Sequence, residues 1–216
     1  MKNLLYKEFL LFFHPAFFLC LLFGALLLIP SWPYFIAFGY LLFMVFSNAF
    51  FIGRTNRDVL FTASLPVRKK DLVRARVYAV ALFELLQVIT AIPFAVINNA
   101  FYTEGNMAGM NTNFAFFGFV LVIYGLFNLV FLPGFYKTAY KIGVPMILGI
   151  IVDSVFALAV TAAVLGVPAL NAALNGLGAA NLPGQLPVLF AGIALFVLLT
   201  LVAYRVSAKR FETVDL

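Results

Sequence analysis

Residues 113–132 read NFAFFGFVLVIYGLFNLVFL, a run in which no side chain carries a charge. A helix rises about 1.5 Å per residue, so a run of this length crosses a hydrocarbon layer of about 30 Å. The apolar residues follow one another without alternating with polar ones, which excludes a strand of a membrane β-barrel. The run therefore predicts a transmembrane helix.

Five further stretches of the chain have the same character, at residues 9–29, 34–52, 77–97, 142–166 and 187–204. Over the whole chain, 65% of residues are hydrophobic and 10% are charged, whereas soluble domains contain about 25% charged residues. So few charges cannot cover a surface exposed to water. We therefore predict an all-α integral membrane protein in which residues 1–216 form a single transmembrane domain of six helices.

The basic residues predict how these helices are oriented. All 14 Lys and Arg lie before the first stretch, between the second and third, between the fourth and fifth, or after the sixth. The connections at residues 30–33, 98–112 and 167–186 contain none. Because Lys and Arg gather on the cytoplasmic side of membrane proteins, we expect both ends of the chain in the cytoplasm.

Two segments each admit two interpretations. Residues 16–29 alone would rise only about 21 Å, so the residues before Pro15 either extend the first span through a kink or lie along the inner leaflet. Residues 167–186 carry no charge and include a possible helical turn or two at residues 169–174. This connection either dips back into the membrane or forms a surface loop.

Several classes of function are excluded by composition. The net charge of +6 follows from the orientation of the spans and does not indicate a nucleic-acid partner. The single Cys and single His cannot form a disulfide, a structural zinc site or the usual catalytic groups of an intramembrane enzyme. The chain also lacks the G-x-x-x-x-G-K-[ST] loop that cradles nucleotide phosphates. We therefore expect no catalytic residue, no metal and no cofactor on this chain.

The connection between the second and third spans is the most informative segment. Residues 53–77 read GRTNRDVLFTASLPVRKKDLVRARV. Thr55 and Asp58 have the spacing of a helix-capping box, and Pro66 disfavours helix at the residue before it. A short helix is expected between them, with Val59, Leu60 and Phe61 exposed unless they contact the membrane or a partner protein. Binding of this basic loop to anionic lipid alone is the simpler alternative.

At two places the sequence resembles the permeases of type 2 ATP-binding-cassette (ABC) exporters, in particular small six-span bacterial members that work with a separate ATPase chain. Arg57-Asp58 followed by SLPVRKKDLV at residues 64–73 is similar to the family's acidic residue and "SLPvsrkdiv" stretch. LPGFYK at residues 132–137 with Gly143 is similar to its "lPlyfkfG" segment. Arg68 departs from the Ser or Thr common in the family, and Gly143 is shifted by an insertion around residues 138–141.

The resemblance implies a coupling helix near residues 58–64 that fits a groove on the ATPase. The residues that it assigns to ATPase coupling are Arg57, Asp58, Val59, Leu60, Phe61, Ser64, Leu65 and Pro66. It further implies that ATP and Mg are bound by the partner ATPase, and that the permease pairs with a second copy of itself or with a paralogous permease. The expected location is the bacterial cytoplasmic membrane, and the expected cargo is hydrophobic or amphipathic and includes peptides.

Three polar residues within the spans form a second candidate site. Glu84 and Gln87 lie in the third span, and Asp153 lies near the middle of the fifth. An ionisable group at the bilayer centre costs about 2.5–3.5 kcal/mol or more, so each one is a functional candidate. They either line a substrate path or have a structural role through hydrogen bonds to a neighbouring helix. A secondary transporter or channel that uses Glu84 and Asp153 is the alternative to the exporter.

Overall fold

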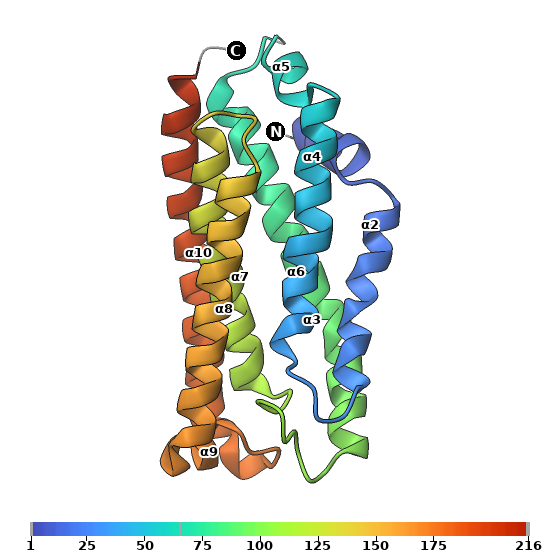
Figure 1. Cartoon of the computed structure of the whole chain (residues 1–216), viewed down its shortest axis with the longest axis vertical. Helices are drawn as coiled ribbons and strands as arrows, with labels where there is room; N and C mark the ends of the chain where they lie inside the picture. The colour runs from blue at the N-terminus through green and yellow to red at the C-terminus, as the bar shows by residue number, and fades with distance from the viewer. Residues whose placement is uncertain (1, 65, 215–216) are drawn as a thin grey trace.

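The computed structural model describes residues 2–64 and 66–214, which form helices joined by short loops. In chain order the helices are α1 (Lys2–Lys7), η1 (Glu8–Phe12), α2 (Ala16–Leu19), η2 (Cys20–Leu28), α3 (Phe35–Tyr40), η3 (Leu41–Phe46), α4 (Ser47–Thr55), α5 (Asp58–Ala63), α6 (Lys69–Phe101), α7 (Phe114–Tyr136), α8 (Gly143–Gly166), α9 (Pro168–Leu174), η4 (Ala179–Asn181) and α10 (Leu182–Glu212). The long helices run side by side along the long axis of the molecule (Figure 1).

Within the described residues, five helices are long and apolar enough to cross a membrane: Phe35–Thr55, Lys69–Phe101, Phe114–Tyr136, Gly143–Gly166 and Ala179–Glu212. They contain five of the stretches expected from the sequence. Several of these helices continue past the ends of the apolar runs into polar residues. Backbone hydrogen bonds keep those residues helical outside the membrane as well. Helix α5 and both ends of the described chain lie together at one end of the bundle (Figure 1). We call it the basic end, because the Lys and Arg flank the spans there.

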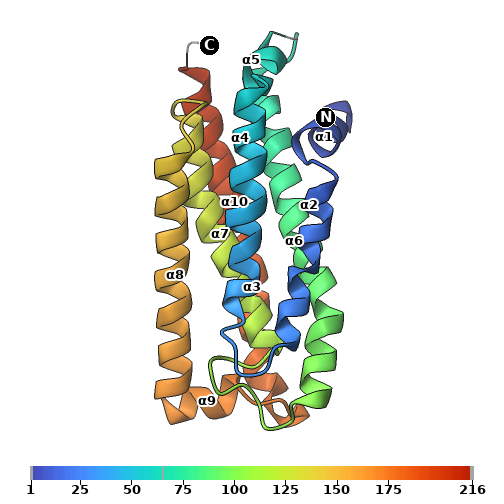
Figure 2. The ribbon, with the colours of Figure 1, turned by 45° about the vertical axis from the view of Figure 1, so that its right-hand side comes forward.

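The first predicted span, residues 9–29, is corrected at its start. The apolar helix there is Ala16–Leu28 and is shorter than the others. The chain breaks before it, with Phe13 in an extended conformation and Pro15 at the helix N-cap. Proline disfavours helix at the residue before it, here His14. Most of this helix is 3₁₀, which rises about 2.0 Å per residue, so the short segment still extends about 24 Å. Helix α1 and η1 turn aside at the basic end (Figure 2).

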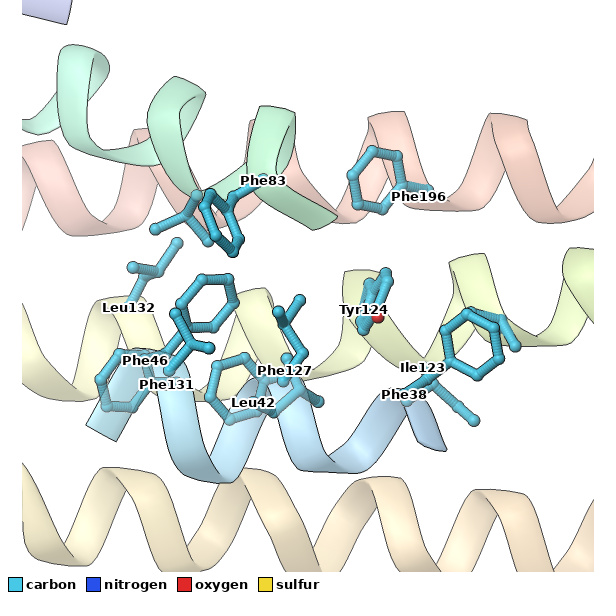
Figure 3. Packing of buried hydrophobic residues seen from close by; sticks show 14 of the residues in the cluster. Phe38, Leu42, Phe46, Phe83, Ile123, Tyr124, Phe127, Phe131, Leu132 and Phe196 are labelled. Carbon is cyan, nitrogen blue, oxygen red and sulfur yellow. The ribbon is translucent and has the colours of Figure 1, made fainter. Parts of the chain in front are cut away.

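Helix α7 lies at the centre of the bundle. In its most apolar window 78% of the residues are buried, against 44% or less in the other four long helices. Its sequence is apolar on every face, which is typical of a helix surrounded by other helices. The core around it is largely aromatic. The rings of Phe46 and Phe127 stack with centroids 6.1 Å apart, and Phe127 stacks on Phe131 at 5.0 Å (Figure 3).

Glycines bring α7 into direct contact with two neighbouring helices. A Cβ on Gly118 of α7 would lie 2.6 Å from the carbonyl oxygen of Val188 in α10, and a Cβ on Gly192 of α10 would overlap the Gly118 carbonyl. Towards α8, Gly149 leaves room for the ring of Phe127. Small residues allow membrane helices to pack closely in this way. Helices α7, α8 and α10 therefore form a tightly packed group.

Asparagine side chains hold together the loops at the opposite end of the bundle. Asn111 donates from its backbone to the Asn175 side chain at 2.8 Å, and the Asn113 side chain donates to Leu174 O at 2.8 Å and to Gly176 O at 3.2 Å. The turn expected at residues 169–174 is present as α9. The two long connections at this end are thus joined to each other.

Candidate functional site

A short helix, α5, lies where the sequence predicted one, at the basic end of the bundle (Figure 1). Of the three apolar residues predicted to be exposed, Leu60 is 45% exposed and Phe61 is 64% exposed. Val59 is half-buried against the core. The free apolar surface of α5 is therefore formed by Leu60 and Phe61.

The predicted capping box at the start of this helix is wrong. Thr55 is the last residue of α4, and its hydroxyl donates to the Phe51 carbonyl at 3.0 Å. Arg57 is the N-cap of α5 with a φ of 52°, and no side chain caps the helix. This left-handed conformation costs about 1–2 kcal/mol in a residue with a Cβ. It forms a tight turn between α4 and α5, and the Asp58 carboxylate is directed to other partners.

Those partners, Lys7 and Arg76, belong to a largely buried cluster of charged residues, which we call the ion cluster: Lys7, Glu8, Asp58 and Arg76. The Arg76 guanidinium donates from Nε to Glu8 and from Nη2 to Asp58. Lys7 Nζ lies 2.7 Å from Asp58 Oδ1 and 3.1 Å from Glu8 Oε1. Two cations and two carboxylates balance each other, which allows Glu8 and Arg76 to be buried and Lys7 and Asp58 to be largely so.

The surroundings of the ion cluster complete its hydrogen bonds and fill the space around it. The Lys7 ammonium also donates to Thr62 Oγ1 at 2.9 Å, and the Arg76 guanidinium carbon lies 3.6 Å from the centroid of the Phe12 ring. Burial alone would raise the pKa of Asp58, but the charges and hydrogen bonds of Arg76 and Lys7 outweigh it and hold that pKa below its ordinary value. Asp58 is therefore ionised at neutral pH and connects α5 to both α1 and α6.

Sequence reasoning identified only Asp58 from this cluster. For Lys7 and Arg76 the sequence predicts a place on the cytoplasmic side but no ion pair, and for Glu8 and Thr62 it predicts no role. One pattern points to Arg76: it lies three and four residues from Val73, Leu72 and Val80, on the buried face of α6. A basic residue on a buried face requires a partner. The sequence does not say which carboxylate that partner is.

The remaining residues of the predicted coupling segment lie beside α5. Ser64 is exposed and its hydroxyl donates to the Phe61 carbonyl at 2.7 Å, and Pro66 is exposed. Leu65 lies outside the described residues. Arg68 is the N-cap of α6 without a capping side chain, in keeping with the absence of a Ser or Thr there, and its Nε donates to Asp71 at 2.8 Å.

The two segments that carry the family resemblance lie next to each other in space. Residues 132–136 form the end of α7, Gly143 begins α8, and the loop between them faces α5. A hollow of about 240 Å³ separates the loop from α4 and α5, lined by Gly53, Arg54, Arg57, Val59, Leu60, Thr138, Ala139 and Tyr140. We call it the α5 hollow.

The polar residues within the spans are buried at the centre of the bundle. Glu84 Oε2 accepts from Asn128 Nδ2 of α7 at 2.8 Å, and Gln87 donates to the Ala37 carbonyl at 3.1 Å and accepts from Tyr124. Asp153 of α8 is 7% exposed. Both of its carboxylate oxygens and Glu84 Oε1 are buried and have no partner among the described residues. Glu84 and Gln87 thus connect α6 to α7, while Asp153 is unpaired.

Comparison with known proteins identifies one family. The model of a family described as ABC-2 family transporter protein matches residues 3–212, nearly the whole chain. The match confirms the resemblance to the permeases of type 2 ABC transporters. No curated protein and no solved structure gives a significant match.

Proposed function

This chain belongs to the ABC-2 family of transporter proteins, and on that premise we propose that it is the permease of an exporter in which α5 receives the movement of a separate ATPase. Membership makes it a multi-pass membrane protein and the membrane subunit of an ABC transporter. The role of α5, the export direction, the cargo and the pairing of two copies are parts of the proposal.

The proposed role of α5 is supported by two features of this helix: it has an exposed apolar surface, and other residues are held in place by ion pairs and hydrogen bonds. At the basic end, Leu60 and Phe61 leave 45% and 64% of their surface exposed. Two other residues of the helix, Asp58 and Thr62, accept hydrogen bonds from Lys7, and Asp58 also accepts one from Arg76. A partner that docks on Leu60 and Phe61 would therefore push against α6 and the N-terminal helix, because a rigidly held element transmits a displacement that a flexible loop would absorb.

The ATPase is expected to be a different polypeptide, and ATP and Mg are expected on that partner. The chain contains no phosphate-binding loop of its own. In this proposal two permeases, identical or paralogous, stand side by side over two ATPase subunits in the bacterial cytoplasmic membrane. Hydrophobic or amphipathic molecules, including peptides, are the proposed cargo, in line with the family resemblance.

The proposal is tested by purifying the tagged protein from its host in mild detergent and identifying any ATPase that comes with it. The variant is Leu60→Ser with Phe61→Ser, which keeps the half-buried Val59. Its matched control is Met107→Ser, an 87% exposed apolar residue at the opposite end of the bundle. We expect the ATPase with wild type and control and its loss from the double variant. Retention of the ATPase by the double variant would refute the role of α5.

A secondary transporter or channel is the second candidate, and one observation favours it. The unpaired oxygens of Glu84 and Asp153 lie inside the membrane region, where carboxylates often serve ion or proton movement. With Gln87, these residues remain our candidates for contact with cargo. Uptake or release by purified protein in vesicles without the ATPase would support this candidate. Transport that requires the ATPase and ATP would support the exporter.

A further inference from the structure

A second hollow lies at the end of the bundle opposite the basic end, between α6 on one side and α7 and α10 on the other. Towards this end α6 draws away from α7 (Figures 1 and 2). The hollow measures about 450 Å³, and residues 177–179, which follow α9, are part of its lining. We call it the outer groove. Pockets of this size and shape hold small ligands in many proteins.

The outer groove is apolar along its length and polar at one end. Towards the middle of the membrane its walls are Val88, Leu121 and Leu189. Towards the loops they are amide and hydroxyl side chains, namely Asn99, Thr112, Asn113 and Gln185. From Val88 to Asn99 the wall follows α6 for about 16 Å. This length is close to that of an extended lauroyl chain, and the polar end lies where the head of a lipid in that leaflet would be.

The polar end of the outer groove carries no charge. None of its lining residues is charged, and Glu104 is the one charged residue in the connections 98–112 and 167–186. A phosphate or carboxylate head would therefore lack a cation to bind. The polar side chains are instead held in place by one another: Asn99 and Thr112 exchange hydrogen bonds at 2.9 Å, and Gln185 donates to Gly176 O at 2.7 Å. No hydrogen bond from the described residues reaches the Gln185 side-chain oxygen.

We propose that the outer groove binds one acyl chain of an uncharged amphiphile from the outer leaflet, as a resident lipid whose hydroxyl-bearing head lies beside Asn99 and Gln185. A groove that faces lipid must be filled, because an empty one loses the dispersion contacts of its walls. An acyl chain fills it without burying any polar group against the apolar walls. The head is selected by hydrogen bonding without charge: the amide groups bond a hydroxyl, whereas an ionic head finds no opposite charge among the lining residues to offset the loss of its water. The argument for this lipid site does not rest on the proposed transport function.

Binding is measured by native mass spectrometry on the purified protein after its lipids have been exchanged for detergent. The probes are 1-lauroylglycerol, laurate and dodecylamine, which share one chain length and differ in the charge of the head. We expect 1-lauroylglycerol to bind at least about tenfold more tightly than either charged probe, the ratio that corresponds to about 1.4 kcal/mol. Equal binding of all three probes would overturn the proposal.

A matched pair of variants on α6 locates the bound chain. Ile92 lines the groove and is 45% exposed, whereas Ile89 is 59% exposed and lies outside the lining. Both face lipid, so tryptophan at either position is expected to leave the fold intact. Ile92→Trp should weaken binding of 1-lauroylglycerol by about tenfold or more, and Ile89→Trp should leave it unchanged. Equal effects of the two would refute the location.

A further variant and a further condition test the head and the kind of occupant. Asn99→Lys places a cation at the polar end and should shift the preference from 1-lauroylglycerol to laurate. An unchanged preference in a folded variant would overturn the placement of the head. Finally, 1-lauroylglycerol should stay bound when ATP is added to the complete transporter. Its ATP-dependent release would identify it as cargo and not as a resident lipid.

Discussion

Arg76→Met tests how much the ion cluster contributes to the fold. Arg76 is 4% exposed and contacts both Glu8 and Asp58. Without it, two carboxylates remain with Lys7 as their one cation in the cluster. Removing one partner from a buried ion pair costs about 3–5 kcal/mol, because a charge is left without compensation. For a chain of this length, 1 kcal/mol corresponds to about 2–4 °C in melting temperature, so the expected loss is about 6–20 °C.

The assay is the loss of monodisperse protein on heating in detergent, followed by size-exclusion chromatography. Lys70→Met is the control, since it removes an exposed cation of the same helix and should change stability by less than about 0.5 kcal/mol. Adding Glu8→Gln to Arg76→Met restores equal numbers of cations and carboxylates, so the double variant should regain about 0.5–3 kcal/mol. A melting temperature of Arg76→Met equal to that of wild type would refute the reasoning.

Three further predictions concern single positions. The ion pairs of Asp58 should stabilise the fold fully above pH 3.8, its ordinary pKa, and this stabilisation should be lost as the pH falls through the lower pKa of the folded state. Melting curves on acidification should therefore show the advantage of wild type over Asp58→Asn shrinking at low pH, and a constant difference would contradict the pairing. Glu84→Leu removes the shorter of the two hydrogen bonds that the Asn128 amide donates, the other going to Thr200, and should cost about 1–3 kcal/mol. Glu84→Gln keeps an acceptor and should melt like wild type. Gly192→Ala should cost about 1–3 kcal/mol by forcing α7 and α10 apart, while Gly39→Ala, with open space beside it, should not destabilise; equal melting temperatures would exclude the close contact.

The long helices could be predicted because their signal is local. A run of about 20 apolar residues indicates a transmembrane helix by itself, without information from the rest of the chain. The error at the first span has a local cause as well. Pro15 was recognised as a break, yet the predicted span still began at residue 9, whereas the apolar helix begins at Ala16. The 3₁₀ winding of residues 20–28 has no signature in the sequence that we could name.

The ion cluster could not be predicted because its partners are far apart in the chain. Lys7 and Asp58 are separated by 51 positions, and Glu8 and Arg76 by 68. Sequence spacing indicates pairs on one helix, and it therefore suggested a local capping role for Asp58. The carboxylate was in fact within reach of two stronger, charged partners from other helices. Charge-assisted hydrogen bonds are about twice as strong as neutral ones, which explains why they determine its position.

The direct contact between Gly118 and Gly192 has a mechanical consequence. Helices that touch backbone to backbone resist sliding and rolling against each other, so we expect α7 and α10, with α8 packed beside them, to move as one rigid body. The earlier helices, α1 to α6, form the other part of the molecule. Between the two parts runs a seam of side chains, which includes the phenylalanine rings of the core and the hydrogen bond from Asn128 to Glu84.

Both hollows open on this seam, the α5 hollow near one end and the outer groove near the other. A rotation of the two parts about a point near the middle would widen one hollow while it narrows the other. The volume available to a lipid on one side of the membrane would then be set by the position of α5 on the other side. A lipid tightly held in the outer groove would resist that rotation and act as a brake on it.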